Sequence, residues 1–212
     1  MSFSMHESQS RFLENNIGRS KEFWIPLYGK LQAIIPNVLA DVELDEFIRG
    51  INYVEKSEIR TEADELTYPL HILVRYELEK EMFLKEENPK DLNLKFNQLM
   101  LEYLGIEIKD DALGILQDVH WSDASFGYFP TYALGSAYAA QFMQQMEKDI
   151  PLQSELMIGD LDPMFVWLRE NIHQYGGLYS ADIILKKTCG EAFNPYYYVN
   201  YLKDKYSKLL GI

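Results

Sequence analysis

Side chains able to bind a metal ion, hold a carboxylate or carry a proton occur in three segments of this 212-residue chain. His6 and Glu7 are adjacent and offer an imidazole and a carboxylate, both common zinc ligands. Arg60 offers a guanidinium, which can hold a carboxylate through two parallel hydrogen bonds. Asp118 and His120 lie two residues apart, and a neighbouring carboxylate commonly orients an imidazole. Each segment also has an ordinary structural explanation.

The spacing alone assigns no function to the first two segments. Adjacent side chains on a helix diverge by about 100°, so His6 and Glu7 do not easily face one ion. An exposed helix start explains them better, because the helix dipole favours an acidic side chain there. Arg60 is followed by Glu62 and Asp64, and such a charged run is typical of a solvated helix start.

The third segment leaves two explanations open. Residues 112–126 combine glycine, serine, aspartate and aromatic residues without a regular period, as expected of a loop over a site or of any irregular loop. An ordered structural role explains His120 as well as a catalytic role does. His71 lies on an apolar helix face and is expected to make a satisfied core or semi-buried contact. His173, near a helix end, is expected to interact with the helix dipole.

Apolar residues recur at spacings of three and four, which predicts helices packed on one face. The predicted helices cover residues 7–20, 24–34, 44–51, 61–85, 91–104, 129–147, 163–175, 180–187 and 194–209. Pro69 predicts a bend or a late start in the fourth of these. Residues 53–60 favour at most a short strand or hairpin arm. We therefore expect an all-α fold, with one short β-hairpin at most, in a single helical domain over residues 1–212.

Composition excludes several classes of function. A net charge of −13 argues against a nucleic-acid groove, which needs basic side chains, and against an anionic membrane surface. No run of eighteen apolar residues predicts a spanning helix. Cys189 is the single cysteine, so no intramolecular disulfide forms and a reducing compartment is favoured. The amino terminus shows no signal peptide, and we expect a cytoplasmic protein.

Three longer motifs, taken together, resemble the Taq-type (thermostable) zinc metallocarboxypeptidase family. They are HESQSR with the ENNIGRS that follows it (residues 6–20), IRTEADELTY (residues 59–68) and GILQDVHW with its aromatic continuation (residues 114–132). The order of the motifs matches the carboxy-terminal part of that family. The end of the chain, residues 167–203, is also similar, so the resemblance covers essentially all of the sequence.

The resemblance implies a mostly helical, groove-shaped zinc peptidase that removes residues one at a time from the carboxy terminus, with broad specificity. Zinc or another divalent metal would be held by the two histidines of His-Glu-x-x-His and by a downstream glutamate. Glu7 matches that third ligand. His6 and Gln9 lie beside it in the motif and are assigned to its surroundings and to substrate binding.

The same resemblance assigns roles around the other two motifs. Arg60 would capture the terminal carboxylate of a peptide, and Asp118 belongs to the same substrate-binding set. His120 would hydrogen-bond the substrate backbone or the developing oxyanion. Tyr132, with Tyr128 as the competing candidate, would stabilise the tetrahedral intermediate, an interaction worth about 3 kcal/mol.

The sequence departs from the family in one decisive respect. Its four histidines include no His-Glu-x-x-His pair, and the family's Asp-x-Arg-x-Thr segment is also missing. A single carboxylate cannot replace the three protein ligands of a catalytic zinc ion, and the general base is absent with them. We therefore predict that this chain alone binds no metal tightly and has no activity.

Two hypotheses follow. In the first, the chain is the carboxy-terminal portion of a metallocarboxypeptidase, which acts on peptides together with the missing amino-terminal half. In the second, it is a truncated, non-catalytic relative that serves as a helical interaction module or self-associates into homo-oligomers, because half a core leaves apolar helix faces exposed. A weaker third option is an acidic metal or peptide binder that uses the groove residues alone.

Overall fold

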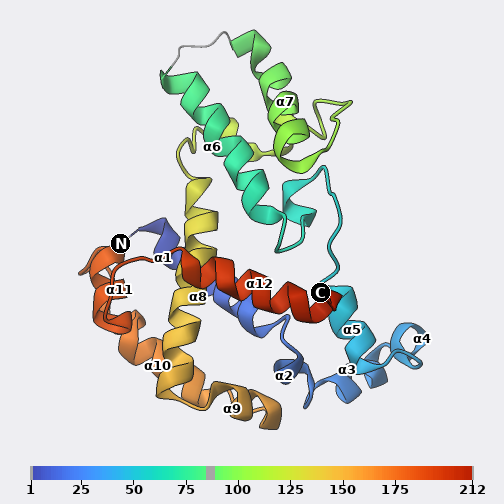
Figure 1. The fold of residues 1–212 in the computed structure, drawn as a ribbon, viewed down its shortest axis with the longest axis vertical. Coiled ribbons are helices and arrows are strands. Elements are labelled where there is room, and N and C mark those ends of the chain that lie inside the picture. The colour runs from blue at the N-terminus through green and yellow to red at the C-terminus, as the bar shows by residue number, and fades with distance from the viewer. Residues whose placement is uncertain (1, 85–88, 212) are drawn as a thin grey trace. The chain divides into compact units, whose positions relative to one another are not determined.

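The computed structural model describes residues 2–84 and 89–211, and within these ranges the chain is helical and contains no strand (Figure 1). The all-α prediction is therefore confirmed. The optional hairpin is not found among the described residues. The sequence also predicts a polar connection at residues 86–91, of which residues 86–88 lie outside the described residues and residues 89–91 form a 3-10 turn.

Residues 53–60 take no strand because local side chains satisfy their backbone. The Ser57 hydroxyl accepts from the Ile59 amide at 3.2 Å, and the Glu55 amide donates to the Asp64 carboxylate at 3.3 Å. Side-chain bonds of this kind compete with a strand ladder. Tyr53 is 66% exposed, so this segment also lacks the buried face that would select a strand.

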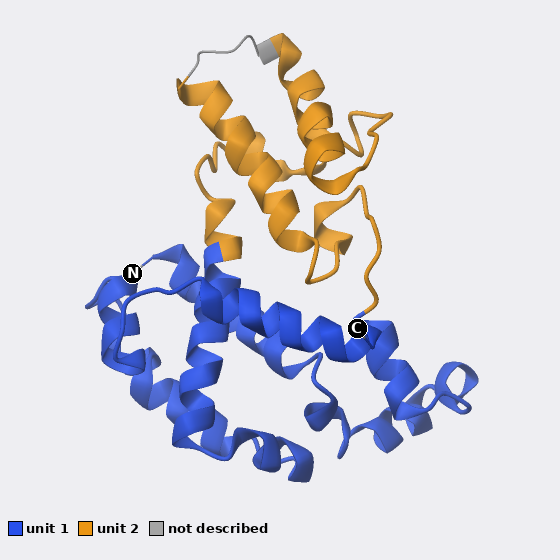
Figure 2. Cartoon of the chain, in the orientation of Figure 1, with its two compact units in different colours: residues 1–52, 134–212 blue, residues 53–133 orange. Residues whose placement is uncertain are grey.

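The contacts within the chain separate into two compact units (Figure 2). Unit 1 comprises residues 1–52 and 134–212, and unit 2 comprises residues 53–133. Each unit has buried hydrophobic clusters of its own. The single helical domain that the sequence predicts over residues 1–212 stays a prediction.

Unit 1 is built from short and medium helices. They are α1 (Phe3–Arg11), the π-helix η1 (Phe12–Ile17), α2 (Lys21–Trp24), α3 (Tyr28–Ile34), α4 (Pro36–Leu39), α5 (Leu44–Ile51), most of α8 (Pro130–Asp149), α9 (Leu152–Ile158), α10 (Asp162–Asn171), η6 (His173–Tyr175), α11 (Ala181–Cys189) and α12 (Tyr196–Leu210). The core places Phe12 and Ile17 of η1 against Phe142 of α8 and Trp167 of α10. The predicted helices at 44–51 and in the last third are confirmed within a few residues.

The first two predicted helices differ from the expectation. Residues 7–20 form the end of an α-helix followed by a π-helix, whose wider turn changes which side chains face the core. The apolar spacing in residues 7–20 predicts a buried stripe that includes Leu13, but this side chain is 41% exposed. The helix predicted at 24–34 breaks after Trp24, because Pro26 cannot donate a backbone hydrogen bond. Ile34 at its end is 75% exposed rather than buried.

Unit 2 is centred on α6 (Tyr68–Leu84) and α7 (Leu92–Leu104), which pack together through Val74, Leu78, Phe96 and Met100. The remaining elements of this unit are the 3-10 turns η2 (Arg60–Glu62), η3 (Pro89–Asp91), η4 (Ile115–Gln117) and η5 (Val119–Trp121), and the first residues of α8. Residues 112–126 therefore form the irregular segment that the sequence predicted.

The sequence predicts Thr61 and Asp91 as the N-caps of the two long helices and Gly105 as the end of the second, and the structure tests these residues. The late start at Pro69 is confirmed, because α6 begins at Tyr68. Thr61 does not cap it. Instead, the Asp64 carboxylate accepts from the amides of the next turn at 2.9 and 3.0 Å. Asp91 makes no side-chain cap to α7, whereas Gly105 ends that helix in the left-handed conformation, as predicted.

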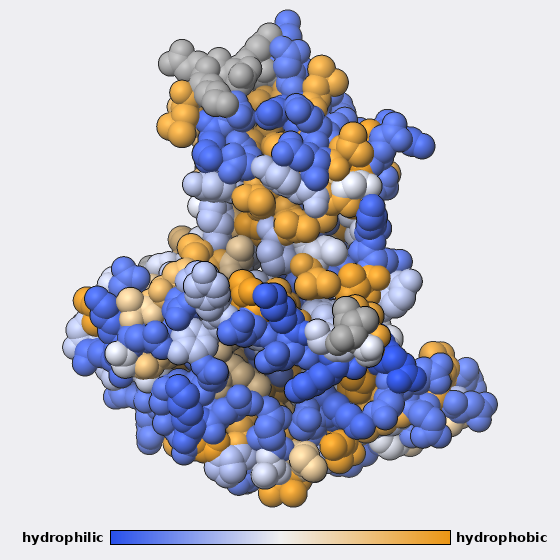
Figure 3. All heavy atoms as spheres, in the orientation of Figure 1, coloured by the Kyte–Doolittle hydropathy of each residue, from blue (hydrophilic) through white to orange (hydrophobic). Residues whose placement is uncertain are grey.

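Exposed apolar side chains are scattered over both units. Figure 3 shows them as separate groups among hydrophilic residues on the visible face. The most exposed are Leu178 (79%), Ile34 (75%), Leu84 (75%) and Ile158 (73%). No helix of the described residues is long and apolar enough to span a membrane.

Close contact between α1 and α8 depends on Gly135. A Cβ atom at this position would lie 2.6 Å from the Cβ of Glu7 and 2.8 Å from its carbonyl carbon. The neighbouring atoms belong to the backbone and the stem of a side chain, so they cannot move aside without shifting a helix. Gly135 therefore allows α8 to approach closely the turn of α1 that carries Glu7.

We predict that Gly135→Ala lowers the free energy of unfolding by about 1 to 3 kcal/mol, because the added methyl group overpacks the contact between the two helices. Urea unfolding followed by circular dichroism measures this change. Gly50→Ala is the matched control, since a Cβ there has no atom within 4 Å. That variant should be neutral or more stable by up to about 1 kcal/mol through helix propensity. Equal effects of the two substitutions would contradict this account of Gly135.

Candidate functional site

Two predicted site residues, Arg60 and Asp118, meet in unit 2, where the buried Asp118 carboxylate also binds Arg75. Asp118 accepts from Arg60 through Oδ1 at 2.8 Å from Nε and 2.7 Å from Nη2. Its second oxygen, Oδ2, accepts from Nε of Arg75 at 2.8 Å. The side chain of Asp118 is 2% exposed, that of Arg60 is 7% exposed and that of Arg75 is fully buried. Two largely buried arginines thus share one buried aspartate.

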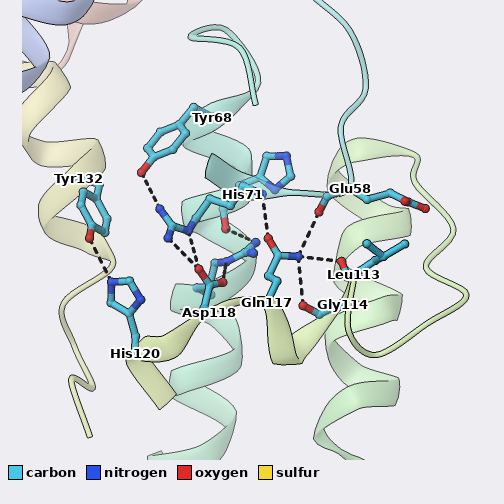
Figure 4. Close-up of polar contacts among 11 residues, drawn as sticks. Glu58, Tyr68, His71, Leu113, Gly114, Gln117, Asp118, His120 and Tyr132 are labelled. Carbon is cyan, nitrogen blue, oxygen red and sulfur yellow. Dashed lines mark hydrogen bonds and ion pairs between the residues drawn. The ribbon is translucent and has the colours of Figure 1, made fainter. Parts of the chain in front are cut away.

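Helix α6 positions this cluster from one face. Tyr68 and Arg75 lie two turns apart on α6, with His71 between them, so their side chains point to the same side. The Tyr68 hydroxyl accepts from Nη1 of Arg60 at 2.9 Å, and Nη1 of Arg75 donates to the His71 carbonyl at 3.1 Å (Figure 4). The helix therefore supplies one arginine and orients the other.

The cluster carries more positive than negative charge. Arg60 and Arg75 contribute two charges and Asp118 removes one, which leaves a net charge of about +1 at neutral pH. Burial lowers the pKa of Arg75 to about 10, although the Asp118 carboxylate opposes that shift. Burial opposes the charge of Arg60 as well, but Tyr68 and Asp118 outweigh it and raise the pKa of this arginine. Both arginines are charged at pH 7, and a further anion would be favoured beside them.

Gln117 joins the segment that carries Arg60 to the motif that carries Asp118. Its Oε1 accepts from the Arg60 amide at 2.8 Å. Its Nε2 donates to the carbonyls of Glu58 at 3.1 Å and Leu113 at 2.7 Å (Figure 4). Gln117 of the QDVHW motif thus holds the two segments together by hydrogen bonds. The sequence did not predict this role.

His120 and Tyr132 form the second pair of the site. Nε2 of His120 lies 3.0 Å from the Tyr132 hydroxyl, across the twelve-residue separation noted in the sequence (Figure 4). The imidazole packs on Phe129 with ring centroids 4.4 Å apart, and the Tyr128 ring lies 5.8 Å away. Burial, and then the positive charge of Arg60, lower the pKa of His120. The imidazole is therefore neutral at pH 7.

The candidates of the first motif belong to unit 1. Glu7 lies on α1 and its Oε2 accepts from the Ser10 hydroxyl at 3.1 Å. The His6 ring lies near the Phe3 ring, 6.2 Å between centroids. Gln9 contacts His173, with Oε1 2.8 Å from Nε2. His173 is the first residue of η6, two residues after α10 ends, and has Gln9 as a side-chain partner; its predicted interaction with a helix dipole stays a prediction.

The residues present do not fit a complete metal centre. Within residues 2–84 and 89–211, no group of three or more histidine, cysteine, aspartate or glutamate side chains is placed to hold an ion. A catalytic zinc ion takes three protein ligands and one open position. Glu7 can supply one of the three, and the described residues group no further ligands of these types with it.

Arg75 is the main site residue that the sequence analysis missed. It stands within the apolar pattern of the helix predicted at 61–85, where an arginine is expected to point outwards. A charged residue between Leu70, Val74 and Leu78 is the signal that could have drawn attention to it, because arginines are seldom fully buried without a partner. His71, expected to make a satisfied core or semi-buried contact, is fully buried.

The fold and site define an all-helical protein with a buried arginine–aspartate cluster beside a histidine–tyrosine pair. The family model described as "Carboxypeptidase Taq (M32) metallopeptidase" matches residues 1–206. The chain therefore belongs to this family, as the three motifs had indicated.

Relatives and solved structures agree with this assignment. The chain is 49% identical over 209 residues to Carboxypeptidase 1 of Bacillus subtilis (strain 168), covering 98% of this chain and 42% of the relative. It is 42% identical over 212 residues to Thermostable carboxypeptidase 1 of Thermus thermophilus, covering 100% and 41%. The structure of the M32 carboxypeptidase from Deinococcus radiodurans R1 matches with a TM-score of 0.94 at 37% identity, covering 100% of this chain and 43% of that one.

The chain thus spans about two fifths of the length of the relatives it matches. This share is consistent with the carboxy-terminal portion that the order of motifs predicted. The activity of the complete relatives is consequently a proposal for this chain rather than an observed property of it.

We predict that Asp118→Ala destabilises unit 2 by about 3 to 5 kcal/mol, because it leaves two buried arginines without a carboxylate. Urea unfolding at pH 7 provides the measurement. Asp91→Ala is the control, since this exposed aspartate makes no side-chain cap to α7, and it should change stability by less than about 0.5 kcal/mol. A loss below 1 kcal/mol for Asp118→Ala would show that the cluster contributes little.

The buried His71 predicts a pH dependence of stability. Burial, followed by the charges of Arg75 and Arg60, lowers its pKa from 6.5 to about 4 in the folded state. The unfolded state therefore binds a proton first as the pH falls below 6.5, and this histidine costs about 2 kcal/mol of stability between pH 7 and pH 5. Below about pH 4 the folded state is protonated too, and the loss stops growing.

The comparison of wild type with His71→Phe isolates this contribution. Urea unfolding at pH 7 and at pH 5 should show a smaller loss for the variant than for wild type, by about 2 kcal/mol. His6→Gln, which replaces an exposed histidine, should follow wild type. The same loss in all three proteins would rule out His71 as the cause.

Proposed function

We propose that this chain is the carboxy-terminal portion of a zinc metallocarboxypeptidase, which removes the last residue of peptides with broad specificity. The family assignment supports the reaction class, and the share of the relatives' length supports the portion. Zinc or another divalent metal belongs to the complete enzyme. Peptides are the proposed substrates, and the cytoplasm is the proposed location.

The positive excess of the Arg60–Asp118–Arg75 cluster is the observation that carries this proposal. A peptide with a free carboxy terminus presents one carboxylate, which would balance the remaining charge of the cluster. Arg60 has five N–H donors, and its contacts with Asp118 and Tyr68 use three of them. The two others are available for a bound carboxylate, so Arg60 can bind the substrate while Asp118 holds its guanidinium in place.

His120 and Tyr132 are proposed to act on the scissile carbonyl. A neutral imidazole bonded to a phenol provides donors of fixed direction without an added positive charge. Such preorganised donors stabilise an oxyanion in the transition state more than the ground-state carbonyl. Tyr128, whose ring lies 5.2 Å from that of Tyr132, remains the competing phenol.

Glu7 is the proposed metal ligand, and it is not sufficient by itself. The two histidines and the general base of His-Glu-x-x-His have to come from a second polypeptide segment. We therefore propose that the isolated chain is inactive and that activity requires this segment.

A non-catalytic interaction module is the second candidate. The observation in its favour is the exposure of large apolar side chains, among them Ile34 and Val38 of the α3–α4 region at 75% and 69%. Such side chains favour a partner or a second copy of the chain. The two proposals make opposite predictions in a complementation assay.

The assay mixes the purified chain with a polypeptide that carries the His-Glu-x-x-His segment of a family member, in the presence of zinc. We expect no release of the terminal residue from an amino-blocked dipeptide by either component alone. The mixture should release it, and a chelator should abolish the release. Glu7→Gln should bind zinc at least about tenfold more weakly in the mixture, because it removes a ligand charge.

Glu14→Gln is the matched control, since this glutamate lies on the same segment but pairs with Arg11 at 2.9 Å. It should retain wild-type activity in the mixture. Chelator-sensitive cleavage by the chain alone would contradict the proposed dependence on a second segment. A stable but inactive complex, or a homo-oligomer that excludes the added polypeptide, would favour the interaction module.

A further inference from the structure

Helix α6 makes a contact with the irregular segment of unit 2 beyond the arginine cluster. Glu79 lies one turn after Arg75 on the same face of the helix. Its side chain is buried, with 6% of the residue exposed, and Oε1 accepts from the Gly127 amide at 3.0 Å. No lysine or arginine of the described residues forms an ion pair with it. This buried carboxylate therefore accepts a hydrogen bond from a backbone N–H group without an ion pair beside it.

The loop that receives this bond has an unfavourable backbone. Ala124 has a φ of 61° and is the one non-glycine residue with a positive φ among those described, and Gly127 follows with 77°. A left-handed alanine costs about 1 kcal/mol or more. Inside the loop, the Ser125 amide donates to the His120 carbonyl at 2.9 Å. The Ser125 amide also donates to Oδ1 of Asp123 at 3.0 Å, and the Tyr128 amide donates to the Ser125 carbonyl at 3.4 Å. Glu79 adds a hydrogen bond from outside the loop at Gly127.

A second contact from α6 supports the same loop. Phe83, one turn after Glu79, packs edge-on against Phe126 with ring centroids 5.0 Å apart. Phe126 also faces the Trp121 ring at 6.3 Å. The last two turns of α6 thus hold the loop at two adjacent residues that follow Ala124, by a hydrogen bond to Gly127 and an aromatic contact with Phe126.

The loop connects the two members of the histidine–tyrosine pair. It starts directly after His120 and Trp121, and it ends at Phe129, which lies under the His120 ring. Tyr132 follows one turn later, with its amide bonded to the Phe129 carbonyl at 3.1 Å. A shift of the loop would therefore move the imidazole, the ring beneath it and the phenol relative to one another.

We propose that Glu79 is a positioning residue of this site: by holding the Gly127 amide, it fixes the geometry of the His120–Tyr132 pair. Glu79 touches neither member of the pair and acts through the loop alone. A catalytic role of the His120–Tyr132 pair rests on the proposed function. The positioning of this pair by Glu79 does not.

If the hydrogen bond between Glu79 and the Gly127 amide positions the loop, two substitutions of similar size at Glu79 should have different effects. Glu79→Gln keeps an oxygen that can accept from the Gly127 amide. Glu79→Met fills the same space without an acceptor. Burial raises the pKa of Glu79, so a neutral amide is well tolerated at this position. Glu77→Met, two residues away, is the control, because Glu77 pairs with Lys80 at 2.9 Å and lies outside the contact.

Nuclear magnetic resonance provides two readouts that need no catalysis. Amide exchange at Gly127 should be at least about fivefold faster in Glu79→Met, as expected for the loss of one hydrogen bond. The titration of the His120 imidazole, assigned with His120→Gln, should move towards the ordinary histidine pKa in the same variant, because a loosened loop exposes the ring. Glu79→Gln and Glu77→Met should match wild type in both measurements.

An unchanged His120 titration in Glu79→Met would overturn the proposal, even if Gly127 exchanged faster. A Glu79→Gln variant that behaves like Glu79→Met would also overturn the proposal, because the loss of the hydrogen-bond acceptor would then not explain the effect. If Glu79→Met loses its wild-type circular dichroism, Phe83→Leu tests the same loop from its aromatic contact, and the same shift of His120 is expected. A failed complementation assay would count against the proposed function and leave these results standing.

Discussion

The buried carboxylate of Asp118 is the contact on which the site depends. Its two oxygens hold two arginines from different parts of unit 2, and each arginine is held again by a neighbour. Removing the carboxylate would leave like charges together in a region of low dielectric, where repulsion is poorly screened. The same arrangement leaves one positive charge in excess. The stability of the cluster and the anion recognition proposed for it therefore have a common origin.

Helix α6 acts as the template for the irregular segment that surrounds it. Tyr68, Arg75, Glu79 and Phe83 recur at helical spacing and contact, in turn, Arg60, Asp118, Gly127 and Phe126. A regular element thus orders a segment that has little regular structure of its own. This explains how two short 3-10 turns and a loop can hold an imidazole and a phenol within hydrogen-bond distance.

The identity of the chain was predictable because its motifs are long and occur in the family order. The site was predictable in part: Arg60, Asp118, His120 and Tyr132 do meet in unit 2. Arg75 was missed because helical periodicity treats a charged residue as an outward one, and only a distant aspartate makes its burial tolerable. Leu13 was misplaced because nothing in the local pattern indicates that the helix widens into a π-turn.

The sequence by itself determined the helical class, the family and the lack of a His-Glu-x-x-His pair, since periodicity, motif order and residue identity are properties of the chain alone. The tertiary structure decided which polar residues are buried and which are paired. Burial and pairing depend on contacts between residues more than forty positions apart, such as Arg75 with Asp118 and Glu79 with Gly127. Local preferences cannot specify such contacts, because their energy appears only when the packed core excludes water around them.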